Sequence, residues 1–192
     1  ELNKTKGDVE MQKEFRADFE AVRALTKQEI GQLTVDLRTR DAYCGMSDYV
    51  NLIHTLSLGC APAQISFAAP LTFDGFVKGG TILYNDLFTI YPFENQLYVI
   101  KMSGREVKAA LEYSYDKWIN TLGAGQKHLL KIKEGADPRT GTKGWSFVNR
   151  PYNFDSAAGL FYEVDVTKPY GQRIQISTLA DGSPFDESVQ YN

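Results

Sequence analysis

The chain has 192 residues, of which 43% are hydrophobic and 12% aromatic, so it can bury the core of one globular domain. Its 21 basic and 24 acidic residues give a net charge of −3, which offers no electrostatic footprint for duplex nucleic acid or an acidic membrane surface. No apolar run approaches the ~20 residues that a membrane-spanning helix needs.

The first 60 residues predict two helices with a short strand between them. Apolar side chains recur at three- and four-residue steps from residue 5 to about residue 28, which indicates an amphipathic helix that Gly31 should end. Alternation over residues 33–37 predicts a short strand. A second helix should follow Ser47, a good N-cap, and end at Gly59.

The middle of the chain predicts two strands and two helices. Residues 65–69 form a short apolar run typical of a buried strand, residues 75–80 indicate a turn, and residues 85–90 a short helix. Residues 96–102 give the clearest strand pattern in the chain. They lead into a capping box, Ser103 to Glu106, which should open a helix with core-facing positions as far as Leu122.

The last third predicts a loop and then two strands. Residues 123–149 are polar and punctuated by glycine, which favours a long exposed loop. Residues 160–166 and 173–179 alternate as strands, with a turn at Asp181-Gly182, and a further strand is expected to begin at the end of the chain. The whole pattern predicts an α+β fold with a mixed, mostly antiparallel sheet and packed helices.

Residues that could carry chemistry are few. The only histidines, His54 and His128, have no partner at metal-ligand spacing, so we expect no metal and no cofactor in this chain. His54 and Ser57 lie three residues apart on one predicted helix, and we interpret this pair as a chance arrangement on the helix surface and not as a nucleophile with its base. Cys44 and Cys60 could pair in an exported protein or remain unpaired, so they do not define the compartment.

Four groups of residues, in order and in register, resemble the C-terminal domain of the 5'-nucleotidase family, and most of all its 2',3'-cyclic-nucleotide 2'-phosphodiesterase/3'-nucleotidase branch. Each string alone would be a weak signal, but together they cover the chain from about Gly31 to its end. The strings are residues 65–70 (ISFAAP), residues 86–95 (DLFTIYPFEN), residues 102–108 (MSGREVK), and residues 152–155 (YNFD) with residues 162–167 and Pro169.

The resemblance implies a piece of a two-domain, metal-dependent nucleotide phosphohydrolase. Residues 1–29 would be the interdomain connector helix, and residues 30–192 a nucleotide-recognition domain truncated at its C-terminus. A divalent metal pair would lie in an N-terminal metallophosphoesterase domain of the same protein, so we expect the isolated chain to hydrolyse no phosphate ester. Family enzymes are exported, which implies a periplasmic, cell-surface or extracellular location.

The resemblance also implies a base-binding site at Phe93 and Asn95, because the family holds the nucleobase between two aromatic rings and one of them lies in this motif. A flat aromatic face stacks on any base, and an amide can donate and accept at a base edge. Tyr91 is a second candidate. Each ring has an ordinary alternative: Phe93 as a core residue at a bend, and Tyr91 as a half-buried tyrosine with its hydroxyl at the surface.

Departures from the family pattern leave the function open. The arginine that grips substrate in the 5'-nucleotidase branch is absent after residues 65–69, and Gln32 stands where another arginine is usual. Arg38 and Arg40 are expected to be exposed or ion-paired, and the family's second aromatic ring would lie beyond Asn192. The alternative function, from a different class, is a stand-alone ligand-binding or interaction module without hydrolase activity.

Overall fold

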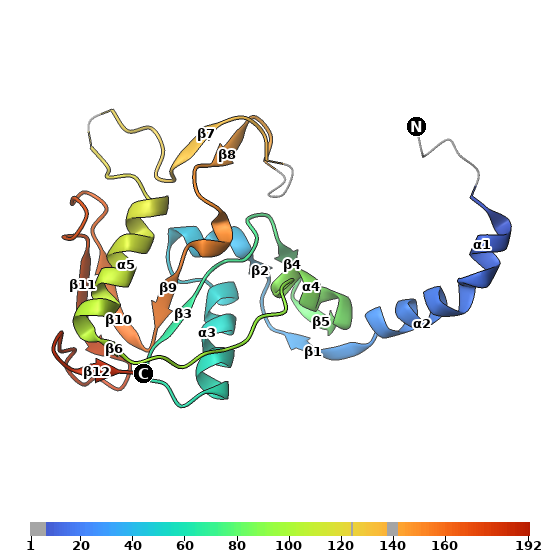
Figure 1. The fold of residues 1–192 in the computed structure, drawn as a ribbon, viewed down its shortest axis with the longest axis horizontal. Coiled ribbons are helices and arrows are strands. Elements are labelled where there is room, and N and C mark those ends of the chain that lie inside the picture. Colours follow the sequence, from blue (N-terminus) through green and yellow to red (C-terminus); the bar gives the residue numbers. More distant parts are fainter. Residues whose placement is uncertain (1–6, 124, 138–141) are drawn as a thin grey trace.

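The computed structural model describes residues 7–123, 125–137 and 142–192, and it confirms the α+β prediction (Figure 1). Within these residues, the strands pair two at a time into small antiparallel sheets. Helices pack against those sheets, and three clusters of buried side chains form the core. None of the helices in the described residues is long and apolar enough to cross a bilayer.

The N-terminal helical segment extends away from the rest of the molecule as two helices, α1 (Val9–Glu14) and α2 (Arg16–Thr26) (Figure 1). The single predicted helix is therefore wrong in detail: it breaks at Phe15, whose φ of −91° and ψ of 4° end one helix and begin the next. Neither helix buries a residue, so no tertiary packing straightens the break. The predicted start at residues 5 and 6 lies outside the described residues.

Two short ladders follow the helices and correct two predictions. Gly31 lies inside β1 (Glu29–Leu33), which pairs with β5 (Gly80–Leu83), and does not end a helix. The predicted strand over residues 33–37 is wrong because the chain bends after β1, and β2 (Leu37–Arg38) then pairs with β4 (Phe76–Val77). The predicted turn over residues 75–80 therefore contains a strand, β4.

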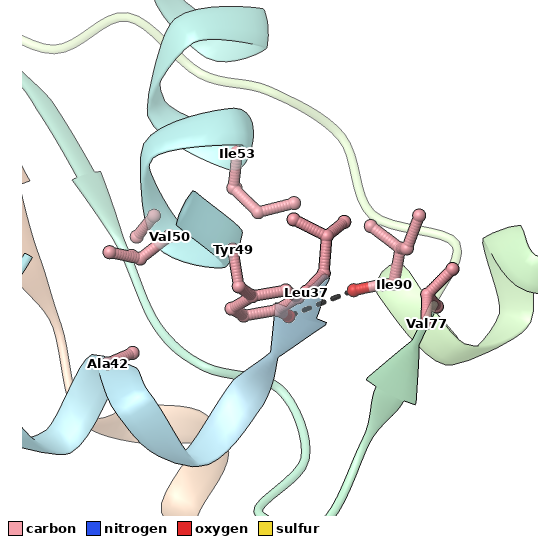
Figure 2. Packing of buried hydrophobic residues seen from close by; sticks show 8 residues of the cluster. Leu37, Ala42, Tyr49, Val50, Ile53, Val77 and Ile90 are labelled. Carbon is pink, nitrogen blue, oxygen red and sulfur yellow. Dashed lines mark hydrogen bonds between the residues drawn. The ribbon is translucent and has the colours of Figure 1, made fainter. Parts of the chain in front are cut away.

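The first core cluster packs α3 (Asp48–Cys60) against β2, β3 (Ser66–Ala68) and α4 (Leu87–Ile90) (Figure 2). Ser47 caps α3 as predicted, since its hydroxyl accepts from the Val50 N–H, but the helix continues through Gly59 to Cys60. The buried Tyr49 hydroxyl donates to the Ile90 carbonyl at 2.9 Å. Between β2 and α3 the chain forms a 3-10 helix, η2 (Thr39–Cys44).

The second core cluster surrounds α5 (Gly104–Trp118), which begins at the predicted capping box. The Ser103 hydroxyl accepts from the Glu106 N–H, and the Glu106 carboxylate accepts from the Ser103 N–H at 2.7 Å. The helix ends at Trp118, so its predicted extension to Leu122 is wrong. Four strands pack around it: β6 (Met102–Ser103) pairs with β12 (Gln190–Tyr191), and β10 (Leu160–Val164) pairs with β11 (Ile174–Leu179).

Two buried charged residues fasten the β10–β11 hairpin to α5. The Glu112 carboxylate accepts from the backbone N–H groups of Gly171 and Ile174, both at 2.8 Å. The Arg173 guanidinium, 1% exposed, donates to the Lys168 carbonyl at 2.9 Å and to the Ile119 carbonyl at 3.0 Å. A cation among the carbonyls at the C-terminal end of a helix is favoured by the helix dipole.

The third core cluster is aromatic and corrects the predicted loop over residues 123–149. This stretch holds a hairpin, β7 (Ile132–Glu134) with β8 (Trp145–Phe147), whose rings pack inward. Tyr43 stacks on Phe147 and on Phe154, in each case with ring centroids 5.2 Å apart. The loop was predicted because glycine and lysine make the average composition of this stretch polar. Its two aromatic core residues, Trp145 and Phe147, are too few to change that average.

The segment from Tyr91 to Lys101, here called the linking segment, joins α4 to β6 without forming a strand (Figure 1). The strand predicted over residues 96–102 is wrong except at Met102. Leu97, Tyr98, Val99 and Ile100 are all exposed, with Tyr98 at 75%. Cys44 and Cys60 are also exposed, and both thiols are free.

Candidate functional site

The three predicted site residues lie on the linking segment, just after α4. Tyr91 is the C-cap residue of α4, and the Asn95 side-chain amide donates to its hydroxyl at 3.0 Å. Tyr91 is 39% exposed and Phe93 is 45% exposed. The fold therefore brings all three together at the surface, and none of them lies in a core cluster.

Phe93 meets a second ring that the sequence prediction left out, Tyr152. Their centroids are 5.9 Å apart with planes at 64°, an edge-to-face contact. Tyr152 lies in η4 (Pro151–Asn153), a 3-10 turn that a proline begins. The Arg150 guanidinium lies 5.8 Å from the Tyr152 ring centroid, and it donates to the Tyr152 hydroxyl at 2.5 Å.

A hollow of about 960 Å³ opens beside this ring pair. Its walls come from residues 71–72, the β7–β8 hairpin and the segment through η4, and they include both rings and the charged side chains of Lys133, Glu134 and Arg150. A hollow of this size, with aromatic walls and a few polar groups, is of the kind that holds small organic ligands. Tyr91 and Asn95 are not among its lining residues, so the predicted trio divides: Phe93 faces the hollow and the other two pair beside it.

Tyr152 and Arg150 are the residues that the sequence prediction missed. The string at residues 152–155 carried part of the resemblance, but it gave no role to its tyrosine. A local signal existed, because an arginine followed by proline and tyrosine places a cation two residues from a ring on a rigid turn. What the sequence alone could not show is that this turn lies against Phe93, almost 60 residues earlier.

His54 lies in the core, so its predicted place on the helix surface is wrong. It is 1% exposed, with Nδ1 3.0 Å from the Ser66 Oγ and Nε2 3.2 Å from the Ser156 Oγ. One arrangement satisfies every group: Ser66 donates to Nδ1, Nε2–H donates to Ser156, and Ser156 donates to the Ala68 carbonyl. Burial lowers the His54 pKa to about 4, so the imidazole is neutral and joins α3 to β3 and β9 (Ser156–Ala158).

The remaining charged candidates behave as surface groups. Arg38 forms an ion pair with Asp36 and Arg40 with Asp74, as expected, and each guanidinium also lies over a phenylalanine ring. Across residues 7–123, 125–137 and 142–192, no three histidine, cysteine, aspartate or glutamate side chains lie close enough together to hold a metal ion. A metal pair therefore does not fit the described residues.

The structure belongs to the class of α+β domains, with small antiparallel sheets around α3 and α5 and an aromatic-walled hollow at one side. The family model described as "5'-nucleotidase, C-terminal domain" matches residues 29–192. The chain therefore belongs to the 5'-nucleotidase C-terminal domain family.

Curated relatives match about half of the chain. It is 31% identical over 93 residues to the trifunctional nucleotide phosphoesterase protein YfkN of Bacillus subtilis, covering 48% of this chain and 6% of that protein. It is 33% identical over 97 residues to the 2',3'-cyclic-nucleotide 2'-phosphodiesterase/3'-nucleotidase of Salmonella typhimurium, covering 48% of this chain and 12% of that protein. The chain thus matches only a small part of these relatives.

Solved structures share the fold along almost the whole chain. A putative 5'-nucleotidase from Staphylococcus aureus superposes with a TM-score of 0.70 at 20% identity, covering 97% of this chain and 34% of that one. A 5'-nucleotidase precursor from Thermus thermophilus gives a TM-score of 0.59 at 22% identity, covering 94% and 31%. At these identities the likeness establishes the fold alone.

Proposed function

We propose that residues 30–192 form the nucleotide-recognition domain of a two-domain nucleotide phosphohydrolase of the 2',3'-cyclic-nucleotide phosphodiesterase/nucleotidase type. Family membership and the phosphoesterase and nucleotidase activities named for the two relatives support this proposal. Residues 1–29 would be the connector to an N-terminal domain of the same protein. That domain would hold the divalent metal pair, and the protein would act outside the cytoplasm.

The observation that carries the proposal is the exposed Phe93 ring on the wall of the hollow. An aromatic ring that is 45% exposed in a concave surface has a face free for a flat ligand. Stacking of a base on such a face contributes roughly 1–3 kcal/mol and tolerates any base, which suits an enzyme that accepts several nucleotides.

Tyr152 and Arg150 add a second ring and a positive charge to the wall of the hollow that Phe93 lines. The Tyr152 ring meets Phe93 edge to face and lines the same hollow, so it adds a second aromatic surface beside the proposed base site. Arg150 also lines the hollow, and its guanidinium would attract the negative groups of a ligand bound there. In this proposal the nucleobase stacks on Phe93. Asn95 and Tyr91 support the linking segment beside Phe93 through the hydrogen bond between their side chains.

Adenosine titration followed by NMR tests this proposal. One ring supplies too little free energy for tight binding, so adenosine should bind in the range of about 1 mM, which corresponds to about −4.1 kcal/mol. Phe93→Ala should weaken binding by roughly 1–3 kcal/mol, about 5- to 150-fold. Phe88→Ala is the matched control, because Phe88 is also exposed and does not line the hollow.

Stability separates a binding ring from a structural one. Since Phe93 is half exposed, its removal leaves no closed cavity, and Phe93→Ala should cost less than about 1 kcal/mol, against roughly 3–5 kcal/mol for a core phenylalanine. A loss of several kcal/mol with unchanged adenosine binding would make Phe93 structural and overturn the assignment.

A further inference from the structure

The β7–β8 hairpin lies at the edge of the domain (Figure 1) and contributes one wall of the hollow that Phe93 lines. Trp145 and Phe147 pack their rings into the third core cluster. Because side chains alternate across a strand, Ser146 between them lies on the other face of β8. Lys133 is opposite Ser146 in the ladder, so these two side chains are neighbours on that face. Both residues line the hollow.

The Ser146 hydroxyl is a polar group available to a ligand. The residue is only 7% exposed, yet its Oγ forms no hydrogen bond with any residue that the structure describes. The hydroxyl of Thr142, on the same hairpin, instead donates to the Trp145 carbonyl at 2.6 Å. Leaving a buried hydroxyl without a partner is unfavourable, so a ligand atom in the hollow that accepts from Ser146 gains a hydrogen bond.

Two cations line the same hollow, Lys133 and Arg150. Within the part of the chain that the structure describes, neither of them forms an ion pair with a carboxylate. Arg150 donates to the Tyr152 hydroxyl at 2.5 Å, which leaves the other N–H groups of its guanidinium for a ligand. The wall therefore holds a hydroxyl and two positive groups that can all donate hydrogen bonds into the hollow.

Two carboxylates, those of Glu134 and Asp137, also line the hollow and limit where an anion can lie. Glu134 follows Lys133 directly in β7, so alternation places it on the opposite face of the strand. Asp137 lies further toward the tip of the hairpin, where it forms a β-bridge with Thr142. An anion is therefore favoured on the side of the wall that holds Lys133 and Ser146, away from the tip.

We propose that Lys133, Ser146 and Arg150 form an anion subsite for the phosphate group of a nucleotide whose base stacks on Phe93, an inference that rests on the proposed function. An ammonium and a guanidinium match a group with more than one negative charge. A phosphate monoester carries about −1.5 to −2 charges at pH 7, and a cyclic diester, which lacks the second ionisable hydroxyl, carries less. The subsite therefore favours nucleoside monophosphates over 2',3'-cyclic nucleotides, and both of these over nucleosides.

NMR titrations of the whole chain with adenosine, 3'-AMP, 5'-AMP and 2',3'-cyclic AMP test the subsite. At low salt the better of the two monophosphates should bind about tenfold more tightly than adenosine, with the cyclic ester between them, because the two cations are exposed and their attraction is partly screened. Combining Lys133→Met with Ser146→Ala should lower this ratio to about threefold or less and leave the affinity for adenosine unchanged. Lys143→Met is the matched control, since Lys143 is an exposed lysine of the same hairpin that does not line the hollow.

Equal affinities for adenosine and for both monophosphates would overturn the subsite. A ratio that survives in the double variant, or that falls equally in Lys143→Met, would also overturn it, because the attraction would then come from the overall charge of the hairpin. If adenosine itself does not bind, the proposed function fails, and ribose 5-phosphate, which has a phosphate but no base, then tests the subsite alone. Shifts of the Lys133 and Ser146 amide signals that disappear in the double variant would support the subsite, and their absence from the unmodified chain would overturn it.

Discussion

Acid should weaken the fold through His54, and the size of the effect follows from its burial. Burial lowers the His54 pKa from 6.5 to about 4, so the unfolded chain binds a proton more readily than the folded one between these values. The stabilising contribution is complete above pH 6.5 and is lost as the pH falls from 6.5 to about 4. At about 1.36 kcal/mol per pH unit, the loss is about 3 kcal/mol.

The measurement is the free energy of unfolding in urea, at a series of pH values, for the wild type and His54→Gln. The difference between them should shrink by about 3 kcal/mol from about pH 7.5 to pH 4, because glutamine does not titrate. Asp155 is exposed at the surface, but desolvation by the groups around it raises its pKa to about 6, so it titrates in the same range in both proteins and cancels in the difference. His128→Gln controls for the loss of an exposed histidine.

A difference that stays constant across this pH range would refute this reasoning. It would mean that the imidazole is protonated in the fold at little cost, and that the hydrogen bonds to Ser66 and Ser156 rearrange to accept the charge. An NMR titration of the His54 ring with a midpoint near its ordinary value of about 6.5 would lead to the same conclusion.

Two further predictions concern the N-terminal helices and the buried Arg173. Deleting residues 1–27 should change the free energy of unfolding of the remaining domain by less than about 1 kcal/mol, since neither α1 nor α2 buries a residue, and a lost cooperative transition would contradict this. Arg173→Met should lower the free energy of unfolding in urea by about 2–4 kcal/mol, because it leaves the buried carbonyls of Lys168 and Ile119 without a donor. The control Arg105→Met, at an exposed site, should cost under about 0.5 kcal/mol. Equal losses for the two variants would show that the buried guanidinium contributes little to stability.

The sequence predicted local structure where the signal is local. The capping box at Ser103 and Glu106 and the N-cap at Ser47 are satisfied by atoms three residues away, so both helix starts are correct. Residues 96–102 show the limit: their strand propensity is strong, but a strand forms only beside a partner, and no described residue pairs with residues 96–101. The β7–β8 hairpin was missed because its aromatic residues find their partners, Tyr43 and Phe73, far away in the chain.

The candidate site was predictable only in part, for a similar reason. Phe93 and Asn95 stand out because a resemblance marks them, and the structure places them at the surface. The contact of Phe93 with Tyr152 and the hollow beside them arise from the turn after β8, which periodicity cannot place against the linking segment. Burial of His54 likewise depends on β3 and β9 meeting, since the pattern of α3 alone indicates a surface position.

The uncovered apolar side chains of α1 and α2 have a practical consequence for experiments on this chain. Val9, Phe15, Phe19 and Val22 are all exposed on helices that extend away from the domain. At the concentrations that a millimolar ligand demands, such surfaces associate with one another, and line broadening or sedimentation would then report contacts between helices instead of ligand binding. Residues 28–192, without the two helices, are therefore the sample of choice for titration and for crystal growth.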